Sequence, residues 1–239
     1  RNGHRTGGLS AGHIQLPTVR HGIAESGCRV GVGRQRMRGE RGPVARLHSR
    51  VSVSHRFANG FGFSVEAKWK SGGENTSQPY SDFVGNGHEE SISWQWKANK
   101  NVSVTPGFNI ESNDSRSIYK PNLRVQYSFD NGFYVAARYR YDYTRYPASA
   151  GKEDDKVNRG DAWAGFVMGN WRTELNYVYA RSSEGVNRND NKPYSQEYNV
   201  KLAYKLDKNW APYGEVGNVG VNDRDDRQTR FRVGVAYSF

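Results

Sequence analysis

Cysteine is nearly absent from this chain of 239 residues, which contains only Cys28. A single thiol excludes an intramolecular disulfide framework and any zinc site built from several cysteines. Long apolar runs are absent too, and without 18 consecutive apolar residues a transmembrane helix is excluded. A transmembrane β-barrel is still allowed, because its strands bury only every second residue in lipid and therefore look polar on average.

The first 50 residues contain no lysine and no Trp, Tyr or Phe, although they contain ten arginines. With two glutamates, this segment carries +8 of the net charge of +11. One interpretation is a basic disordered arm that binds nucleic acid or anionic lipid. The other, which the composition favours, is translation from a wrong reading frame, since a segment so different from the rest is a different kind of sequence. It also has no secretory signal, because it lacks an apolar core of about 7 to 15 residues.

We therefore expect two parts. Residues 1–46 form an aberrant Arg/Gly-rich segment that is disordered or non-native, and residues 47–239 form one domain. Mass spectrometry that detected peptides from residues 1–45 in the mature protein would contradict the reading-frame interpretation.

From about Arg50 onward, apolar and polar residues alternate in segments of roughly ten residues, which is typical of β-strands with two different faces. No helical period interrupts them, so the sequence predicts an all-β fold, a transmembrane antiparallel up-and-down barrel. Eleven strands are readable, although the facing of 161–168 and 210–219 is not determined. They span residues 51–57, 61–69, 92–96, 102–110, 123–129, 133–143, 161–168, 175–179, 198–206, 210–219 and 231–239.

Short and long connections alternate along the chain, as they do in outer-membrane barrels with short turns at one rim and long loops at the other. The short ones are rich in Asn, Asp and Gly, as tight hairpins require, and lie at 58–60, 98–101, 130–131, 169–170 and 207–209. The longer ones lie at 72–87, 112–117, 147–158, 182–193 and 221–227.

Aromatic residues gather at the two ends of the predicted strands, which fits the two boundaries between water and lipid. A soluble barrel or sandwich with an aromatic core is the alternative, but the second row of each strand is ionic. Beside the short turns lie Phe57, Phe61, Phe129, Phe133, Trp171, Trp210 and Phe239, and at the long-loop end lie Trp69, Tyr119, Tyr143 and Tyr146.

If the apolar row faces lipid, the opposite row lines the lumen, because side chains alternate along a strand. From Arg56 onward the predicted lumen row holds twelve basic and six acidic residues. Pairing across strands absorbs part of this charge, but an excess of cations remains. Fixed positive charge in a low-dielectric wall concentrates anions, and rings of Arg and Lys are typical of anion-selective pores. We expect an acidic permeant.

Four stretches resemble the KdgM family of oligogalacturonate-specific porins: HRFANGFGFSVEAKW (55–69), ARYRYDY (137–143), YKLDKNWAPYGEVGNV (204–219) and DRQTRFRVGVAYSF (226–239). The resemblance runs from about Leu47 to Phe239. It implies a monomeric, twelve-stranded barrel of the Gram-negative outer membrane that contacts lipopolysaccharide, needs no cofactor and admits acidic oligosaccharides released from pectin. The barrel assembly machinery is expected to act through Phe239.

The same resemblance implies that basic lumen residues guide the substrate carboxylates. Carried over position by position, this role falls on Arg124, Arg138, Arg140, Arg230 and Arg232, with Lys68, Lys97 and Lys201 as weaker candidates. A sister branch of the family carries sialic acid. The alternatives are thus a sialic-acid channel, a general anion-selective porin or, in another class, a structural or adhesive barrel.

One departure from the family concerns the first strand, which should pair with the last. Residues 28–48 offer only the weakly alternating CRVGVGR. If the first strand is lost to a frame error, the barrel has an unpaired seam between residues 46–57 and 228–239. Such a seam is costly in lipid. We therefore predict a damaged or mis-started version of a real porin.

No catalytic site is predicted. Outside the first segment the only histidines are His55 and His88, and neither has the partners of a Ser–His–Asp triad, which argues against a barrel phospholipase. Loop carboxylates, among them Asp154, Asp155, Asp223, Asp225 and Asp226, could bind a divalent cation, but their pattern favours solvated charges. We predict a channel and not an enzyme, with no metal site.

Overall fold

The computed structural model describes residues 23–33, 44–71, 83–186, 188, 192–220 and 227–238. Strands dominate, and the helical structure in these ranges is the single turn of 3-10 helix η1 (Ala148–Ala150). Within the same ranges, no helix is long and apolar enough to span a membrane. The strands are β1 (Ile23–Gly33), β2 (Val44–Arg56), β3 (Phe61–Ser71), β4 (Phe83–Trp94), β5 (Trp96–Lys97), β6 (Val102–Asn113), β7 (Arg116–Ser128), β8 (Phe133–Arg145), β9 (Asp155–Met168), β10 (Trp171–Ser182), β11 (Tyr194–Tyr204), β12 (Trp210–Gly220) and β13 (Arg227–Ser238).

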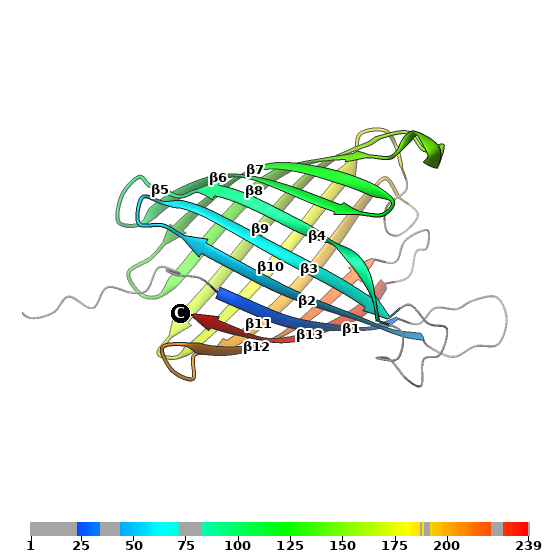
Figure 1. Cartoon of the computed structure of the whole chain (residues 1–239). Coiled ribbons are helices and arrows are strands. Elements are labelled where there is room, and N and C mark those ends of the chain that lie inside the picture. Colours follow the sequence, from blue (N-terminus) through cyan, green and yellow to red (C-terminus); the bar gives the residue numbers. More distant parts are fainter. Residues whose placement is uncertain are drawn as a thin grey trace, which may run out of the picture.

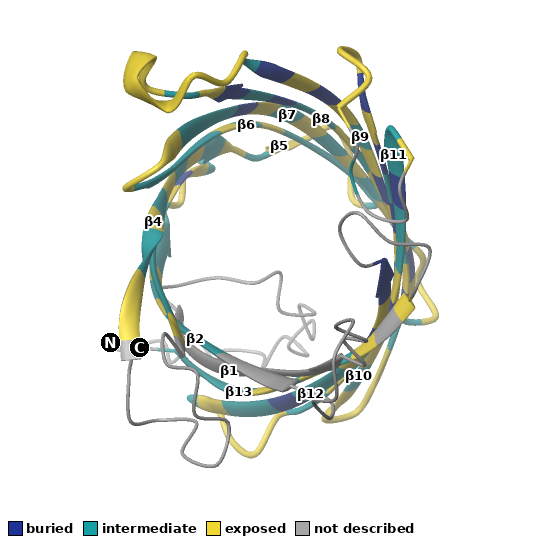
Figure 2. Ribbon diagram, turned by 90° about the vertical axis from the view of Figure 1, so that its right-hand side faces the viewer, coloured by how far each residue is buried: buried dark blue, intermediate teal, exposed yellow. Residues whose placement is uncertain are grey.

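The strands form a closed antiparallel barrel in which sequence neighbours pair with one another (Figure 1). Two further pairings close the ring: β1 pairs with β13, and β4 pairs with β6. Seen end-on, the strands form a closed ring (Figure 2). The predicted fold class is confirmed.

Strands β4 and β5 are two parts of one strand, so the thirteen segments make a ring of twelve. Both parts pair with β6, through Ser93 opposite Gly107 and Trp96 opposite Val104. In this register Pro106 lies opposite Trp94. Proline has no N–H to donate, which explains why the ladder is interrupted between β4 and β5. The even number agrees with bacterial outer-membrane barrels.

The predicted seam is not present. Strand β1 lies between β13 and β2 and pairs with both over nearly its whole length, from Ile23 opposite Ser238 and Ser54 to Val32 opposite Thr229 and Ala45. The first strand is thus present in the described chain, and the unpaired edge that its loss would leave is absent there. The backbone of β1 is paired on both sides, which is the condition for a strand to cross lipid without exposed N–H and C=O groups.

The two faces of the wall differ as the alternation predicts. The apolar row points outward and remains exposed on the isolated chain, with Leu175 53 % exposed and Val233 60 % exposed. Inward positions are polar, or small and packed, as with Ala136 and Val178. Because large apolar side chains cover the outside and charged side chains line the inside, the hydrophobic surface of this fold suits lipid.

Short turns at one rim share a side-chain hydrogen-bond pattern that fits their Asn and Asp content. The Oδ1 atoms of Asn59, Asn131 and Asp207 accept the backbone N–H of Phe61, Phe133 and Asn209, respectively, at 2.7–3.1 Å. Gly60, Gly132 and Gly169 adopt positive φ there. The five predicted short connections are confirmed.

The predicted longer connection at 112–117 is wrong. Strand β6 continues to Asn113 and β7 begins at Arg116, so only two residues join them. Asn113 Oδ1 accepts the amides of Ser115 and Arg116, which makes this a tight polar turn. The longer connection placed at 72–87 is also too long, because β4 begins at Phe83.

The aromatic rings at the short-turn rim lie on the outer face. Phe57, Phe129 and Trp210 are each 44–46 % exposed. Several rings contact one another, as in the pairs Phe57–Phe61, Phe133–Phe166 and Trp210–Tyr237. Such a ring of amphipathic side chains fits a membrane boundary. Phe239 lies outside the described residues.

Candidate functional site: the charged lumen

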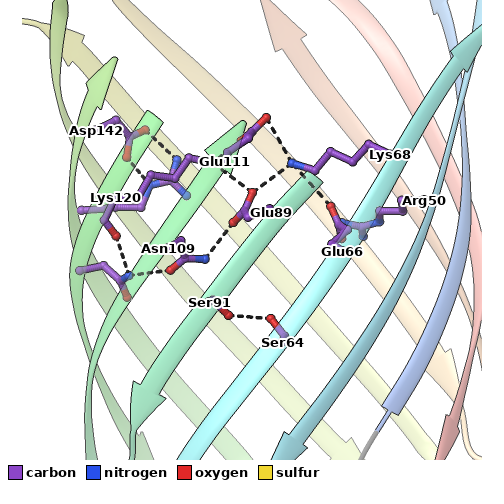
Figure 3. Close-up of polar contacts among 12 residues, drawn as sticks. Arg50, Ser64, Glu66, Lys68, Glu89, Ser91, Asn109, Glu111, Lys120 and Asp142 are labelled. Carbon is purple, nitrogen blue, oxygen red and sulfur yellow. Dashed lines mark hydrogen bonds and ion pairs between the residues drawn. The ribbon is translucent and has the colours of Figure 1, made fainter. Parts of the chain in front are cut away.

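A network of glutamates and lysines connects the inner faces of β2, β3, β4, β6 and β7 (Figure 3). Lys68 Nζ lies 3.0 Å from Glu89, 3.2 Å from Glu111 and 3.7 Å from Glu66. Lys120 Nζ contacts the same two carboxylates, Glu89 at 3.1 Å and Glu111. Since Lys120 is only 4 % exposed, this network is a desolvated part of the wall.

The network is extended by polar neighbours on both sides. Arg50 donates to Glu66 at 3.1 Å, and Asn109 donates to Glu89 at 2.8 Å and accepts from Asn122 at 3.0 Å. Each carboxylate thus meets at least one cation. Lys68, one of the weaker candidates from the sequence, is therefore a neutralised member of a structural cluster.

Arginines on β8 and β9 are also paired, but with fewer acids. Arg140 makes a two-pronged contact with Asp142, at 2.6 and 2.7 Å. Arg138 and Arg159 share a single acceptor, Asp161, at 2.9 and 2.8 Å. The Asp161 carboxylate is nearly inaccessible, with its side chain 1 % exposed. Two cations on one carboxylate leave this part of the wall with an excess of positive charge.

Arg124 on β7 lies beside this group and has no carboxylate within 4.0 Å among the described residues. Its guanidinium carbon lies 4.6 Å from the ring centroid of Trp163, and that of Arg138 lies 5.3 Å from the same centroid. Arg124 also donates to Gln126 at 3.1 Å. An aromatic face attracts a cation without cancelling its charge, so Arg124 keeps its full charge toward the lumen.

A second aromatic-supported cation lies on β11. Lys201 Nζ lies 4.1 Å from the ring centroid of Tyr213. Its register neighbours include Glu174 and Glu215, but the described part of the chain places neither within 4.0 Å of it. Glu215 instead accepts from Arg232 at 2.6 Å, and Glu174 contacts Arg172 at 3.2 Å.

Arg230 and Arg232 on β13 form a further basic group. Arg230 donates to Asn199 at 2.9 Å and lies 3.3 Å from Glu197 and 4.0 Å from Glu215. In ring order, β13 lies six places from β7, half of the circumference. Basic side chains of β7 and of β13 therefore lie on opposite sides of the lumen.

The Tyr134 ring lies over Gly165 of β9, and its hydroxyl belongs to another polar group. Its hydroxyl donates to Glu174 and accepts from Arg172 at 2.9 and 3.1 Å. A Cβ atom at Gly165, its register partner, would overlap the tyrosine ring. Only glycine leaves room for the ring at this position.

The loop aspartates expected to be solvated differ from one another at the long-loop rim. Asp154 accepts from the Tyr143 hydroxyl at 2.5 Å and from the Tyr146 amide at 3.1 Å, and these hydrogen bonds lower the pKa of its carboxyl. Asp155 is not solvated: it begins β9, is 8 % exposed and accepts from Ser182 at 2.6 Å. Asp223, Asp225 and Asp226 lie outside the described residues.

Of the other predicted site residues, Lys97 lies exposed on β5, close to the short-turn rim. Sequence reasoning did not find Trp163, Arg159, Asp161 and Glu89. The first three lie on β9, where Trp163 points inward and the neighbouring alanines point outward. The usual alternation of apolar and polar residues therefore does not predict which face of β9 lines the lumen. Glu89 lies on β4 between the predicted loop at 72–87 and the predicted strand at 92–96, in residues assigned to neither.

The family model described as oligogalacturonate-specific porin protein (KdgM) matches residues 37–239. The chain belongs to the KdgM family of porins. It is 41 % identical over 199 residues to the oligogalacturonate-specific porin KdgM of Dickeya dadantii, covering 80 % of this chain and 84 % of that protein. It is also 40 % identical over 193 residues to the uncharacterised protein YiiY of Salmonella typhimurium, covering 80 % and 83 %.

Solved structures agree with the family assignment. A KdgM porin structure matches with a TM-score of 0.66 and 32 % identity, covering 91 % of this chain and 99 % of that one. A second KdgM structure, in complex with disordered oligogalacturonate, matches with a TM-score of 0.65. Membership in the KdgM family makes this chain an outer-membrane channel protein and not an enzyme.

Proposed function

We propose that this porin admits oligogalacturonates across the outer membrane by diffusion through a lumen with net positive charge. The observation that carries the proposal is the 41 % identity with a porin named for that substrate, together with the match to a KdgM structure that holds oligogalacturonate. The candidate guiding residues are Arg124, Arg138, Arg140, Arg230, Arg232, Lys68, Lys97 and Lys201.

The balance of charge supports the same conclusion. Among the described residues on inward-facing positions, basic side chains outnumber acidic ones. The basic set is Arg50, Arg56, Lys68, Lys97, Lys120, Arg124, Arg138, Arg140, Arg159, Arg172, Lys201, Arg230 and Arg232, and the acidic set is Glu66, Glu89, Glu111, Asp142, Asp155, Asp161, Glu174, Glu197 and Glu215.

The chemistry of the substrate class fits this wall. Each galacturonate unit carries one carboxylate, and guanidinium groups present a planar fork that matches carboxylate geometry. Basic groups on opposite sides of the lumen allow successive carboxylates of one chain to meet cations on both walls. A low-dielectric wall increases the local concentration of such anions.

Block of ion current in planar bilayers tests the proposal. We expect trigalacturonate to reduce the conductance of the purified porin at concentrations where neutral maltotriose has no effect. Equal block by both sugars would contradict it. If sialic acid blocks as strongly as trigalacturonate, the channel belongs with the sialic-acid branch, and if simple inorganic anions compete equally, it is a general anion-selective porin.

Three related expectations belong with this proposal. We infer that the barrel functions as a monomer, that its apolar belt contacts lipid and lipopolysaccharide, and that the assembly machinery binds through Phe239. Cross-linking and native mass spectrometry of the porin in detergent test the oligomeric state, and a dominant trimer would contradict the monomer.

A further inference from the structure

The lumen cations differ in the groups that hold them. Most lumen arginines and lysines lie within 4.0 Å of a carboxylate, such as Arg140 with Asp142 and Arg232 with Glu215. An ion pair with a carboxylate has little net charge when seen from the lumen axis. Arg124 and Lys201 have no carboxylate within that distance in the described chain and lie on aromatic rings, Trp163 and Tyr213. Arg56 also lacks a carboxylate there, but it donates to the Gly60 carbonyl and Ser93 Oγ beside the short-turn rim.

The register explains why Arg124 needs a neutral partner. Its direct neighbours across the two adjacent strands are Arg138 and Thr105, so no acid can reach it from an opposite position. Like charges directly opposite each other repel, which would push Arg124 and Arg138 apart. Trp163 offers one ring to both guanidinium groups, at 4.6 and 5.3 Å, within the range of about 6 Å for a cation–π contact.

The register neighbours of Lys201 are Glu174 and Glu215, but both carboxylates contact other side chains. Glu215 pairs with Arg232 at 2.6 Å, and Glu174 interacts with Arg172 and with the Tyr134 hydroxyl. The Tyr213 ring, which is 8 % exposed, is therefore the surface that holds the lysine. At two separate places in the barrel, a cation thus lies on an aromatic ring, which holds it without neutralising its charge.

We propose that Trp163 and Tyr213 are positioning residues for substrate selection. They hold Arg124 and Lys201 in the lumen with their charge intact, and these two cations, more than the numerous paired ones, set the preference for acidic sugars. This inference rests on the proposed function, because it names the residues that produce the preference for a polyanion.

Trp163→Leu tests the role of the ring, because it removes the aromatic face and leaves every charge in place. We expect the trigalacturonate concentration for half block to rise about three- to tenfold, corresponding to about 0.7–1.4 kcal/mol. Trp163→Phe should recover most of the loss. Trp171→Leu is the matched control, since it removes a lipid-facing tryptophan and should leave the block unchanged.

A second set of variants keeps the proposal testable even if Trp163→Leu does not fold. Arg124→Gln removes a cation that has no carboxylate within 4.0 Å in the described chain, whereas the double variant Arg50→Gln/Glu66→Gln removes a whole ion pair at constant net charge and leaves Lys68 with Glu89 and Glu111. We expect the first to reduce the chloride-to-potassium permeability ratio and the trigalacturonate block clearly, and the second to change each by less than about twofold. Equal losses in the two variants would overturn the proposal, as would equal effects of Trp163→Leu and Trp171→Leu.

The two readouts separate this inference from the function on which it rests. If the wild-type porin shows no block by trigalacturonate, the proposed substrate is wrong, and the permeability ratio for small ions still measures whether Trp163 and Arg124 control the charge of the lumen. If the wild type is blocked but Trp163→Leu and Arg124→Gln leave both readouts intact, only the role of the aromatic-supported cations is wrong.

Discussion

Lysines of this wall differ in what they contribute, because their neighbours differ. Lys120 is almost fully enclosed by Glu89 and Glu111, whereas Lys201 lies on a neutral ring. Removing one partner of a buried ion pair leaves uncompensated charge in a low-dielectric surrounding. Lys120 is therefore expected to stabilise the folded barrel, and Lys201 is expected to contribute positive charge to the lumen.

Lys120→Met is expected to lower the free energy of unfolding by about 2 kcal/mol, less than the largest losses for buried pairs because Lys68 still contacts both glutamates. Lys100→Met is the matched control: its contact with Asp130 is exposed on both sides, and its loss should cost less than about 0.5 kcal/mol. Urea unfolding in lipid vesicles measures both. Equal losses would contradict the structural role of the network.

Single residues also mark the limits of prediction from the sequence. The outward aliphatic row was predictable because alternation is a property of the strand itself. Trp163 was not, because a tryptophan facing inward between two outward alanines reverses the usual pattern. The acceptor of Arg138 was not predictable either, since Asp161 lies opposite it only through the register between β8 and β9. Arg140 instead contacts Asp142, two residues away on its own strand.

Tyr134 of β8 lies over Gly165 of β9, its register partner. Gly165→Ala would place a methyl group inside the tyrosine ring and displace it from Arg172 and Glu174, so we expect a loss of about 1–3 kcal/mol in stability. Gly160→Ala on the same strand is the control, because no atom lies within 4 Å of the added group. Thermal unfolding that shifts equally for both variants would contradict this packing.

Strand β1 shows why an element can exist without a clear pattern. Its sequence alternates weakly and contains several glycines, so local propensity predicts little there. The flanking strands β2 and β13 each present a row of backbone donors and acceptors, and a strand between them satisfies both. Backbone pairing with β2 and β13 in the closed ring thus determines that these residues form a strand, which the local sequence alone does not predict.

The closed ring predicts a cooperative requirement for its first strand. Deletion of residues 1–43 removes β1 and leaves β2 and β13 with unpaired backbone groups in lipid, which costs several kcal/mol for each unsatisfied group. We expect no heat-modifiable folded band in electrophoresis and no pore activity. Full pore activity of this shortened chain would contradict the pairing of β1 with β13.

The reading-frame interpretation of residues 1–46 and the pairing of β1 lead to opposite expectations, because β1 (Ile23–Gly33) lies inside that segment. The composition of residues 1–46 still predicts a segment foreign to the rest of the domain, and the family model matches from residue 37. Detection of peptides from residues 1–45 in outer-membrane protein by mass spectrometry would contradict the foreign origin, whereas a functional pore without them would contradict the pairing of β1 with β13 and β2.

The barrel as a whole encloses a hydrophilic lumen, and the charge of that lumen is expected to select the permeant. Uptake of trigalacturonate into proteoliposomes, measured beside uptake of maltotriose of similar size, tests this most directly. We predict that the porin admits trigalacturonate several times faster than maltotriose and that the difference shrinks as salt screens the wall charge. Equal uptake of both sugars at low salt, or faster uptake of maltotriose, would contradict the account.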